Sequence, residues 1–274
     1  MVHSLFGVKI NDIGPSEFQK YVSQWLLEKE GRVVFTPNAE MILEARQNEM
    51  FRLLLNQSDL SIPDSISLKF AVAALSDGIL SHRLPGVDAL MIIASECARA
   101  NKKLILLGGE HSVSELAADK LKKKFQNLCV SWCGLGNVYF EGDDVVIDGK
   151  VVNELVDKRA DVVAVALGQK KQEFAINKLR KSVQGVKIWI GVGGALDMIS
   201  GIKPRAPLDF RKLGFELFWR FCLEPSRWRR IMNATIVFPS FVFLDTLKRR
   251  RACKSIWKVI KEFVVLFKVY EDQN

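Results

Sequence analysis

The sequence predicts an α/β protein: a Rossmann-like parallel sheet with helices on both faces, followed by a basic helical appendage at the C-terminus. Three observations predict this architecture. Short apolar runs alternate with segments of helical periodicity. Several of the apolar runs end in glycine pairs or polar residues, and after residue 200 both the basic charge and the aromatic content rise. We therefore expect two parts, residues 1–200 and residues 201–274.

The elements of the first part follow from these patterns in chain order. Apolar runs bounded by turn residues are typical of buried strands, and they occur at 33–35, 60–63, 103–107, 161–167 and 187–192. Apolar residues at helical spacing predict helices at 41–54, 84–100, 112–125 and 172–183. Strands and helices that alternate in this way form parallel sheets covered on both faces.

Polar residues and glycines gather at the carboxyl ends of the predicted strands. In open α/β sheets, ligands bind at this edge. The dinucleotide pattern G-x-G-x-x-G is absent, and GVGGA at 191–195 is only a weak variant of it. The residues that we expect at this edge are Thr36, Asn38, Asp64, Gly108, Gly109, Gln172, Gly193 and Gly194.

The net positive charge of the chain comes from the second part. The formal net charge is +9, yet residues 1–200 contain 24 basic and 24 acidic side chains, whereas residues 201–274 contain 16 basic and 7 acidic ones. Such an excess suggests an anionic partner. Because arginines alternate with large aromatic residues, an anionic membrane surface fits best, with a solvated basic face as the alternative. No nucleic-acid-binding motif accompanies the charge, so we expect no nucleic acid.

Other sequence features exclude several classes. The N-terminus lacks the pattern of a signal peptide, and the five cysteines are irregularly spaced, which favours a cytoplasmic chain with reduced cysteines. The three histidines show no metal-ligand spacing with each other or with the cysteines, so we expect no metal site. The longest apolar run, 234–244, contains Pro239 and Ser240, so no segment is expected to span a bilayer.

Nine short segments together resemble the WecG/TagA/CpsF family of bacterial glycosyltransferases, from about residue 5 to residue 235. Their order and spacing carry the resemblance. They are TPNAE at 36–40, SDLSIPD at 58–64, RLPGVD at 83–88, LLGG at 106–109, GQKKQE at 168–173, GVGGALD at 191–197, RAP at 205–207, LGFE at 213–216 and EPSR at 224–227.

The resemblance implies a catalytic α/β domain and a membrane-associating appendage. It implies inverting transfer of a sugar, typically N-acetylmannosamine, from a UDP-sugar to a polyprenyl-diphosphate-linked saccharide, without a metal or other cofactor. The setting would be synthesis of teichoic acid or another surface polysaccharide, by a peripheral protein on the inner face of the plasma membrane. Two alternatives stay open: a nucleotide-dependent oxidoreductase on a similar sheet, and an inactive membrane-bound scaffold.

The resemblance also implies roles for individual residues. Asp64 would be the general base that takes the proton of the acceptor hydroxyl, although such loops also favour a capping aspartate. Thr36 and Asn38 would orient the substrates, unless Asn38 only caps the next helix. Arg83 would pair with a donor phosphate, or else form a surface ion pair with Asp88. Gln172 would touch the sugar or a phosphate.

Further residues would bind the donor and the acceptor lipid. Gly108, Gly109, Gly193 and Gly194 would let the backbone approach the donor closely. Asp197 would accept hydrogen bonds from its uridine, or only favour a helix N-terminus. Arg220, Arg227 and Arg230, at helical spacing, would grip the lipid diphosphate or bind lipid headgroups. Self-association through the apolar appendage is also expected.

The sequence departs from the family pattern at three positions. Ser65 and Ser67 stand where the family commonly has glycines, and Lys170 replaces a proline. Proline would pre-set the first turn of the following helix, so we expect a looser loop at Lys170.

Overall fold

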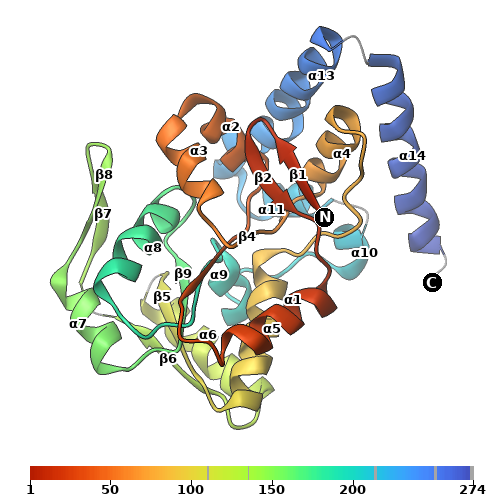
Figure 1. Ribbon diagram of the computed structural model, residues 1–274. Coiled ribbons are helices and arrows are strands. Elements are labelled where there is room, and N and C mark those ends of the chain that lie inside the picture. Colours follow the sequence, from red (N-terminus) through yellow and green to blue (C-terminus); the bar gives the residue numbers. More distant parts are fainter. Residues whose placement is uncertain (110, 135, 213–214, 250–251, 272–274) are drawn as a thin grey trace.

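A six-stranded parallel sheet forms the centre of the molecule (Figure 1). The computed structural model describes residues 1–109, 111–134, 136–212, 215–249 and 252–271, without the side chains of residues 111, 212, 217, 220, 227, 252–254 and 266–271. The strand order is β4-β3-β10-β9-β5-β6. The strands are β3 (Arg32–Phe35), β4 (Leu60–Ser61), β5 (Lys103–Gly108), β6 (Cys129–Cys133), β9 (Val162–Ala166) and β10 (Ile188–Gly191).

The inner strands are apolar on both sides because each side faces a separate layer of helices. In β10, Trp189 packs into one core, and Ile188 and Ile190 pack into the other. β9 alternates in the same way and is buried along its whole length. This burial explains why the strands could be recognised as continuous apolar runs. The predicted fold class is confirmed.

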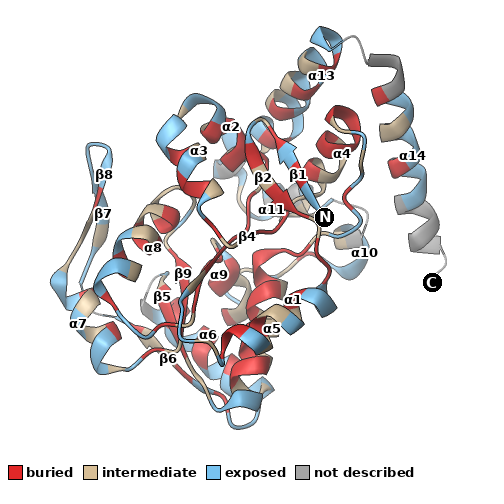
Figure 2. Ribbon diagram, in the orientation of Figure 1, coloured by how far each residue is buried: buried red, intermediate tan, exposed pale blue. Residues whose placement is uncertain are grey.

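Helices cover both faces of the sheet, with their apolar sides turned inward (Figure 2). One core holds side chains from α1 (Pro15–Trp25), α5 (Gly86–Ala100), α6 (His111–Lys124) and α9 (Ala195–Ser200). The other holds side chains from α2 (Ala39–Gln47), α3 (Glu49–Asn56), α4 (Ile66–Leu75), α7 (Gly149–Asp157) and α8 (Lys171–Ser182).

The helix expected at 41–54 is two helices that meet at Asn48. The backbone of Asn48 is extended (φ −116°, ψ 100°), and its side chain accepts a hydrogen bond from the backbone N–H of Phe51 at 2.9 Å. An asparagine that caps a new helix in this way competes with continuation of the old one. The apolar periodicity continues across the break because both helices pack into the same core.

Two antiparallel hairpins and an edge strand were not predicted. β1 (Val2–Leu5) pairs with β2 (Val8–Asn11), and β7 (Val138–Glu141) pairs with β8 (Asp144–Ile147). The second hairpin extends from the body beside α8 (Figure 1). β6 is an edge strand with a mixed burial pattern, which makes its sequence less distinctive than the runs at the centre of the sheet.

The appendage begins where α9 ends and consists mainly of helices. They are α10 (Leu208–Lys212), α11 (Glu216–Leu223), the 3₁₀ turn η1 (Pro225–Arg227), α12 (Trp228–Met232), the π-helical segment η2 (Asn233–Val237), α13 (Phe238–Lys248) and α14 (Ala252–Glu271). Ala234, Phe238 and Val242 insert into the core beside α2 and α4. The appendage is therefore packed against the α/β body, on the face that carries the hairpin β1–β2.

The apolar segment around Pro239 is helical. Residues 228–248 run as one helix, because the π-helical segment comes just before the proline. Proline is tolerated in the first turn of a new helical segment, and π-bulges accommodate locally displaced hydrogen bonds. This helix is long and apolar enough to cross a membrane by length and composition alone, and the expectation that no segment spans a bilayer stays a prediction.

The turn after β5 gives a stability test. Gly108 has a φ of 97°, and a Cβ there would lie 2.6 Å from the carbonyl oxygen of Ala166. Gly142 has a φ of 62°, with no described heavy atom within 4 Å of its Cβ position. Gly142→Ala should cost about 1–2 kcal/mol of the free energy of unfolding from backbone conformation alone. Gly108→Ala should cost more, on the order of 3 kcal/mol, because overlap adds to it. Urea unfolding of both variants tests this, and equal losses would contradict it.

Candidate active site

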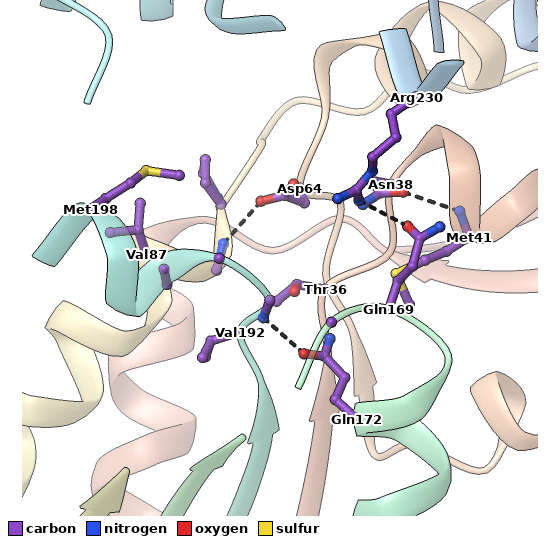
Figure 3. Close-up of a pocket in the computed structure, with 16 residues that line it drawn as sticks. Thr36, Asn38, Met41, Asp64, Val87, Gln169, Gln172, Val192, Met198 and Arg230 are labelled. Atoms are coloured by element: carbon purple, nitrogen blue, oxygen red, sulfur yellow. Dashed lines mark hydrogen bonds between the residues drawn. The ribbon is translucent and has the colours of Figure 1, made fainter. Parts of the chain in front are cut away.

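A cleft opens at the carboxyl ends of β3, β4, β9 and β10 (Figure 3). It encloses about 620 Å³, including space open to solvent. The structure brings most of the expected residues together here, and it adds Gln169, next to Gly168, from the loop before α8. The expected residues that line the cleft are Thr36, Asn38, Asp64, Gln172, Gly193, Gly194 and Arg230.

Asp64 lies at the mouth of this cleft, directly before α4. One carboxylate oxygen accepts a hydrogen bond from the backbone N–H of Gly86 at 3.0 Å. Gly86 is the first residue of α5, so the carboxylate faces the positive end of a helix dipole. The backbone N–H of Asp64 donates to the carbonyl of Pro37 at 3.0 Å, which fixes the loop after β4 against the loop after β3. Asp64 is thus a held carboxylate at the strand edge, suited to accept a proton.

Thr36 and Gln172 form the floor of the cleft and hold the end of β10. The hydroxyl of Thr36 donates to the carbonyl of Gly191 at 2.9 Å. The side-chain oxygen of Gln172 accepts from the backbone N–H of Gly193 at 2.9 Å. Both side chains are buried. They therefore position the glycine turn, and their contact with substrate stays a prediction.

Asn38 caps α2, as its alternative interpretation suggested. Its side-chain oxygen accepts from the backbone N–H of Met41 at 3.0 Å. The residue also lines the cleft, so the cap fixes the orientation of the side-chain amide beside Asp64 and Arg230 (Figure 3).

Arg230 reaches the cleft from the appendage. Its Nε lies 2.8 Å from Oε2 of Glu40, and its Nη2 donates to Oε1 of Gln169 at 3.4 Å. Glu40 and Gln169 were not among the predicted site residues. Figure 3 shows the guanidinium pointing down between Asn38 and Gln169. The appendage thus supplies a cationic wall of the cleft. Arg220 and Arg227, predicted to act with Arg230, have side chains outside the described residues.

Arg83 lies away from the cleft, between the body and the appendage. Its Nη2 donates to the carbonyl of Arg211 at 3.2 Å, and its Nη1 lies 3.9 Å from Glu216. Asp88 pairs with Arg205 and not with Arg83. Its two carboxylate oxygens accept hydrogen bonds from the guanidinium of Arg205 at 2.7 and 2.6 Å. The structure therefore gives Arg83 a bridging position, and the cationic residue described in the cleft is Arg230.

Asp197, Gly108 and Gly109 lie beside the cleft and not among its lining residues. Asp197 Oδ2 pairs with Lys203 at 3.0 Å, and Lys203 also pairs with Glu224. Burial alone would lower the pKa of Lys203, but its hydrogen bonds to both carboxylates raise it. Asp197 lines an adjacent cavity with Gly194. Its contact with uridine, and donor binding at the two glycines after β5, stay predictions.

The departures from the family pattern have structural consequences. Ser65 is the N-terminal cap position of α4, and the hydroxyl of Ser67 donates to that of Ser65 at 3.3 Å. Lys170 adopts a φ of 69°, which proline cannot adopt because its ring holds φ near −65°. Lys170 Nζ also pairs with Glu44 at 2.8 Å. The backbone before α8 therefore has a conformation at Lys170 that the proline of the family pattern could not adopt.

No cluster of three or more potential metal ligands is found among the described residues.

Glu173 is a buried neighbour of the cleft residue Gln172 that the sequence analysis did not single out. It is fully buried directly below the cleft, and its Oε1 accepts from Nε2 of Gln172 at 2.6 Å. Its Oε2 has no hydrogen-bond partner among the described residues. Burial raises the pKa of Glu173 from 4.5 to about 7. A glutamate in the first turn of a helix is usually exposed, so only its place in the GQKKQE segment could have pointed to it.

The raised pKa makes the stability of the protein depend on pH. Between about pH 4.5 and 7 the native state retains a proton on Glu173 that the unfolded state has lost, so the contribution of this group becomes less favourable as pH rises. Glu173→Gln removes this dependence and keeps an acceptor for Gln172. As the pH rises from 5 to 8, the free energy of unfolding of the variant should increase by on the order of 3 kcal/mol relative to that of wild type. Urea unfolding across this range measures the difference, and a constant difference would contradict the assignment.

Comparison with known proteins identifies the family of the chain. A sequence model of the glycosyl transferase WecG/TagA/CpsF family matches residues 3–252. An N-acetylglucosaminyldiphosphoundecaprenol N-acetyl-beta-D-mannosaminyltransferase of Bacillus spizizenii is 28% identical over 88% of this chain and 90% of its own length. Proteins of the same name from Bacillus subtilis and Staphylococcus aureus are 27% and 28% identical, over 84% and 81% of this chain and 84% and 82% of their own lengths. The chain belongs to the WecG/TagA/CpsF family and is a glycosyltransferase.

Proposed function

We propose that this protein transfers N-acetylmannosamine, or a closely related sugar, from a UDP-sugar to a polyprenyl-diphosphate-linked saccharide, with inversion. The observation that carries the proposal is that a carboxylate, Asp64, and a guanidinium, Arg230, line the same open cleft. A carboxylate and a guanidinium suit a reaction that deprotonates a hydroxyl next to a diphosphate. The names of three relatives contain the same donor sugar and lipid-linked acceptor.

The reaction is a single displacement. The oxygen of the acceptor hydroxyl bonds to the anomeric carbon of the donor, while the bond from that carbon to the UDP phosphate oxygen breaks. The hydroxyl proton goes to the carboxylate of Asp64, and the bonding electron pair leaves with UDP. The helix dipole of α5 favours the ionised form of Asp64, which is the form that can accept a proton. One such displacement inverts the anomeric centre.

The leaving UDP gains negative charge in the transition state, which the protein must stabilise. The turn at Gly193 and Gly194 borders the cleft, and the buried hydrogen bonds of Thr36 and Gln172 hold it still. We assign the donor to this side of the cleft, with stabilisation by protein groups and no metal. The acceptor diphosphate then lies on the side of Arg230.

The appendage supports an interfacial location. It carries the basic excess of the chain, and large apolar side chains on α13 and α14 are exposed. Basic charge combined with exposed apolar surface is the combination that holds peripheral proteins on anionic membranes. We propose that the protein works on the inner face of the plasma membrane in surface-polymer synthesis.

The proposal predicts that Asp64→Asn lowers turnover by about 10²–10⁴-fold, the usual contribution of a general base. Asparagine can still accept the hydrogen bond from Gly86, so the fold is expected to persist. The assay is UDP release from a panel of UDP-sugars, with a short-chain prenyl-diphosphate-linked N-acetylglucosamine as acceptor and liposomes present.

The matched control for Asp64 is Asp148→Asn. Asp148 also accepts a helix N-terminal N–H, from Lys150 at 2.9 Å, but it caps α7 away from the cleft. This control should keep wild-type turnover. If Asp64→Asn turns over as fast as the control, Asp64 is not the base. If wild type releases no UDP with any donor in the presence of acceptor, the inactive-scaffold alternative is favoured.

Arg230→Ala should raise the acceptor KM by about 10–100-fold, because a charge-assisted contact to a diphosphate contributes about 1.5–3 kcal/mol. The control is Arg249→Ala, since Arg249 is an exposed arginine paired with Asp245 at 2.9 Å within its own helix. The donor KM should change little in either variant. Equal acceptor KM values in both variants would show that the effect is one of overall charge and not of the cleft.

A further inference from the structure

An apolar groove separate from the cleft lies between α4, α13 and α14. It encloses about 990 Å³, including its open side, and its surface is almost wholly apolar. The residues of α4 that line the groove are three or four positions apart at most, so they lie on one face of that helix. Residues from the three walls include Phe70, Ala74, Val242, Val259, Ile260 and Phe263.

α14 contacts α4 at two points along the groove. At one end, the hydroxyl of Ser255 donates to the carbonyl of Ala74 at 2.6 Å, and Lys258 Nζ donates to the carbonyl of Ser76 at 2.8 Å. These bonds satisfy carbonyls at the C-terminus of α4. Toward the other end, the rings of Phe70 and Phe263 lie 6.1 Å apart.

Two stretches of chain each contribute residues to both the groove and the cleft. On one side, Asp64 lines the cleft, and Ser67, three residues later, lines the groove. On the other side, Arg230 lines the cleft and Phe238 lines the groove, and both belong to the continuous helix of residues 228–248. Eight helical residues span about 12 Å. A charged contact and an apolar channel thus follow each other along one helix.

We propose that this groove binds the first isoprenoid units of the acceptor lipid while its diphosphate lies beside Arg230. The proposal rests on the function proposed above. A polyprenyl diphosphate changes abruptly from a doubly charged group to pure hydrocarbon, and the protein shows the same change between the cleft and the groove. A different surface is available to contact bilayer lipid, because Trp257, Val264 and Val265 on α14 are exposed and do not line the groove.

The test measures binding of two soluble prenyl diphosphates, one of five carbons and one of twenty, to the full chain by calorimetry without membranes. Wild type should bind the longer chain at least about tenfold more tightly, because each additional methylene removed from water adds affinity. Equal affinities for the two chain lengths would overturn the proposal.

Two variants of α14 form a matched pair. Ile260 lines the groove and is 49% exposed, whereas Val265 lies outside it and is 43% exposed. Ile260→Glu should abolish the preference for the longer chain, because a carboxylate would enter the groove, whereas Val265→Glu should keep it. Equal loss in both variants would overturn the proposal. Ala74→Leu is a second test of the same kind, since it fills the groove without charge, and circular dichroism checks its fold.

Other occupants give different results. If the groove takes acyl chains of the bilayer, Ile260→Glu weakens binding to phosphatidylglycerol vesicles and wild type shows no chain-length preference in solution. If it takes a second copy of the chain, Ile260→Glu changes the sedimentation coefficient, again without a chain-length preference. Either result overturns the proposal. Because these measurements need no turnover, a preserved chain-length preference with no sugar transfer would count against the proposed function alone.

Discussion

Two hydrogen bonds at the end of β10 hold together the edge of the sheet that borders the candidate active site. Thr36 donates to the carbonyl of Gly191, and Gln172 accepts from the N–H of Gly193. They connect the loop after β3, the turn after β10 and the start of α8. All strands of this sheet are parallel, so their carboxyl ends lie at one edge. With the turn fixed there, Asp64 and Asn38 come to border the same space as the glycine turn.

Two carboxyl groups at the cleft have different electrostatic surroundings. Asp64 lies at the N-terminus of α5, where the helix dipole favours negative charge. Glu173 lies in the floor without a second hydrogen-bond partner among the described residues, so burial favours its neutral form. If the donor carries two phosphates, as proposed, a protonated Glu173 below the glycine turn avoids an anion that would repel it. Glu40 is paired with Arg230, so its charge is balanced within the cleft.

The central sheet could be predicted because burial on both faces leaves an unambiguous pattern, as in β9 and β10. The same logic failed for β6 and the two hairpins, whose exposed positions weaken the apolar signal. Asp64, Asn38 and Gln172 were placed correctly at the edge because their sequence positions directly follow strands or begin the next helix. The position of Arg83 beside the appendage and the burial of Glu173 could not be predicted, because pairing with the appendage and burial under the cleft are tertiary effects that no local pattern records.

The appendage shows why a glycosyltransferase of this kind would need more than an α/β body. The sheet edge supplies the carboxylate of Asp64 and a glycine turn, but the cationic group described in the cleft comes from α12. Core contacts of Ala234, Phe238 and Val242 hold this helix against the body, so the position of Arg230 depends on apolar packing two turns away. A substrate with a charged head and a hydrocarbon tail can use both features of such a helix at once. Tail binding would then orient the diphosphate before the sugar transfer begins, which reduces the orientational freedom that the reaction must otherwise overcome.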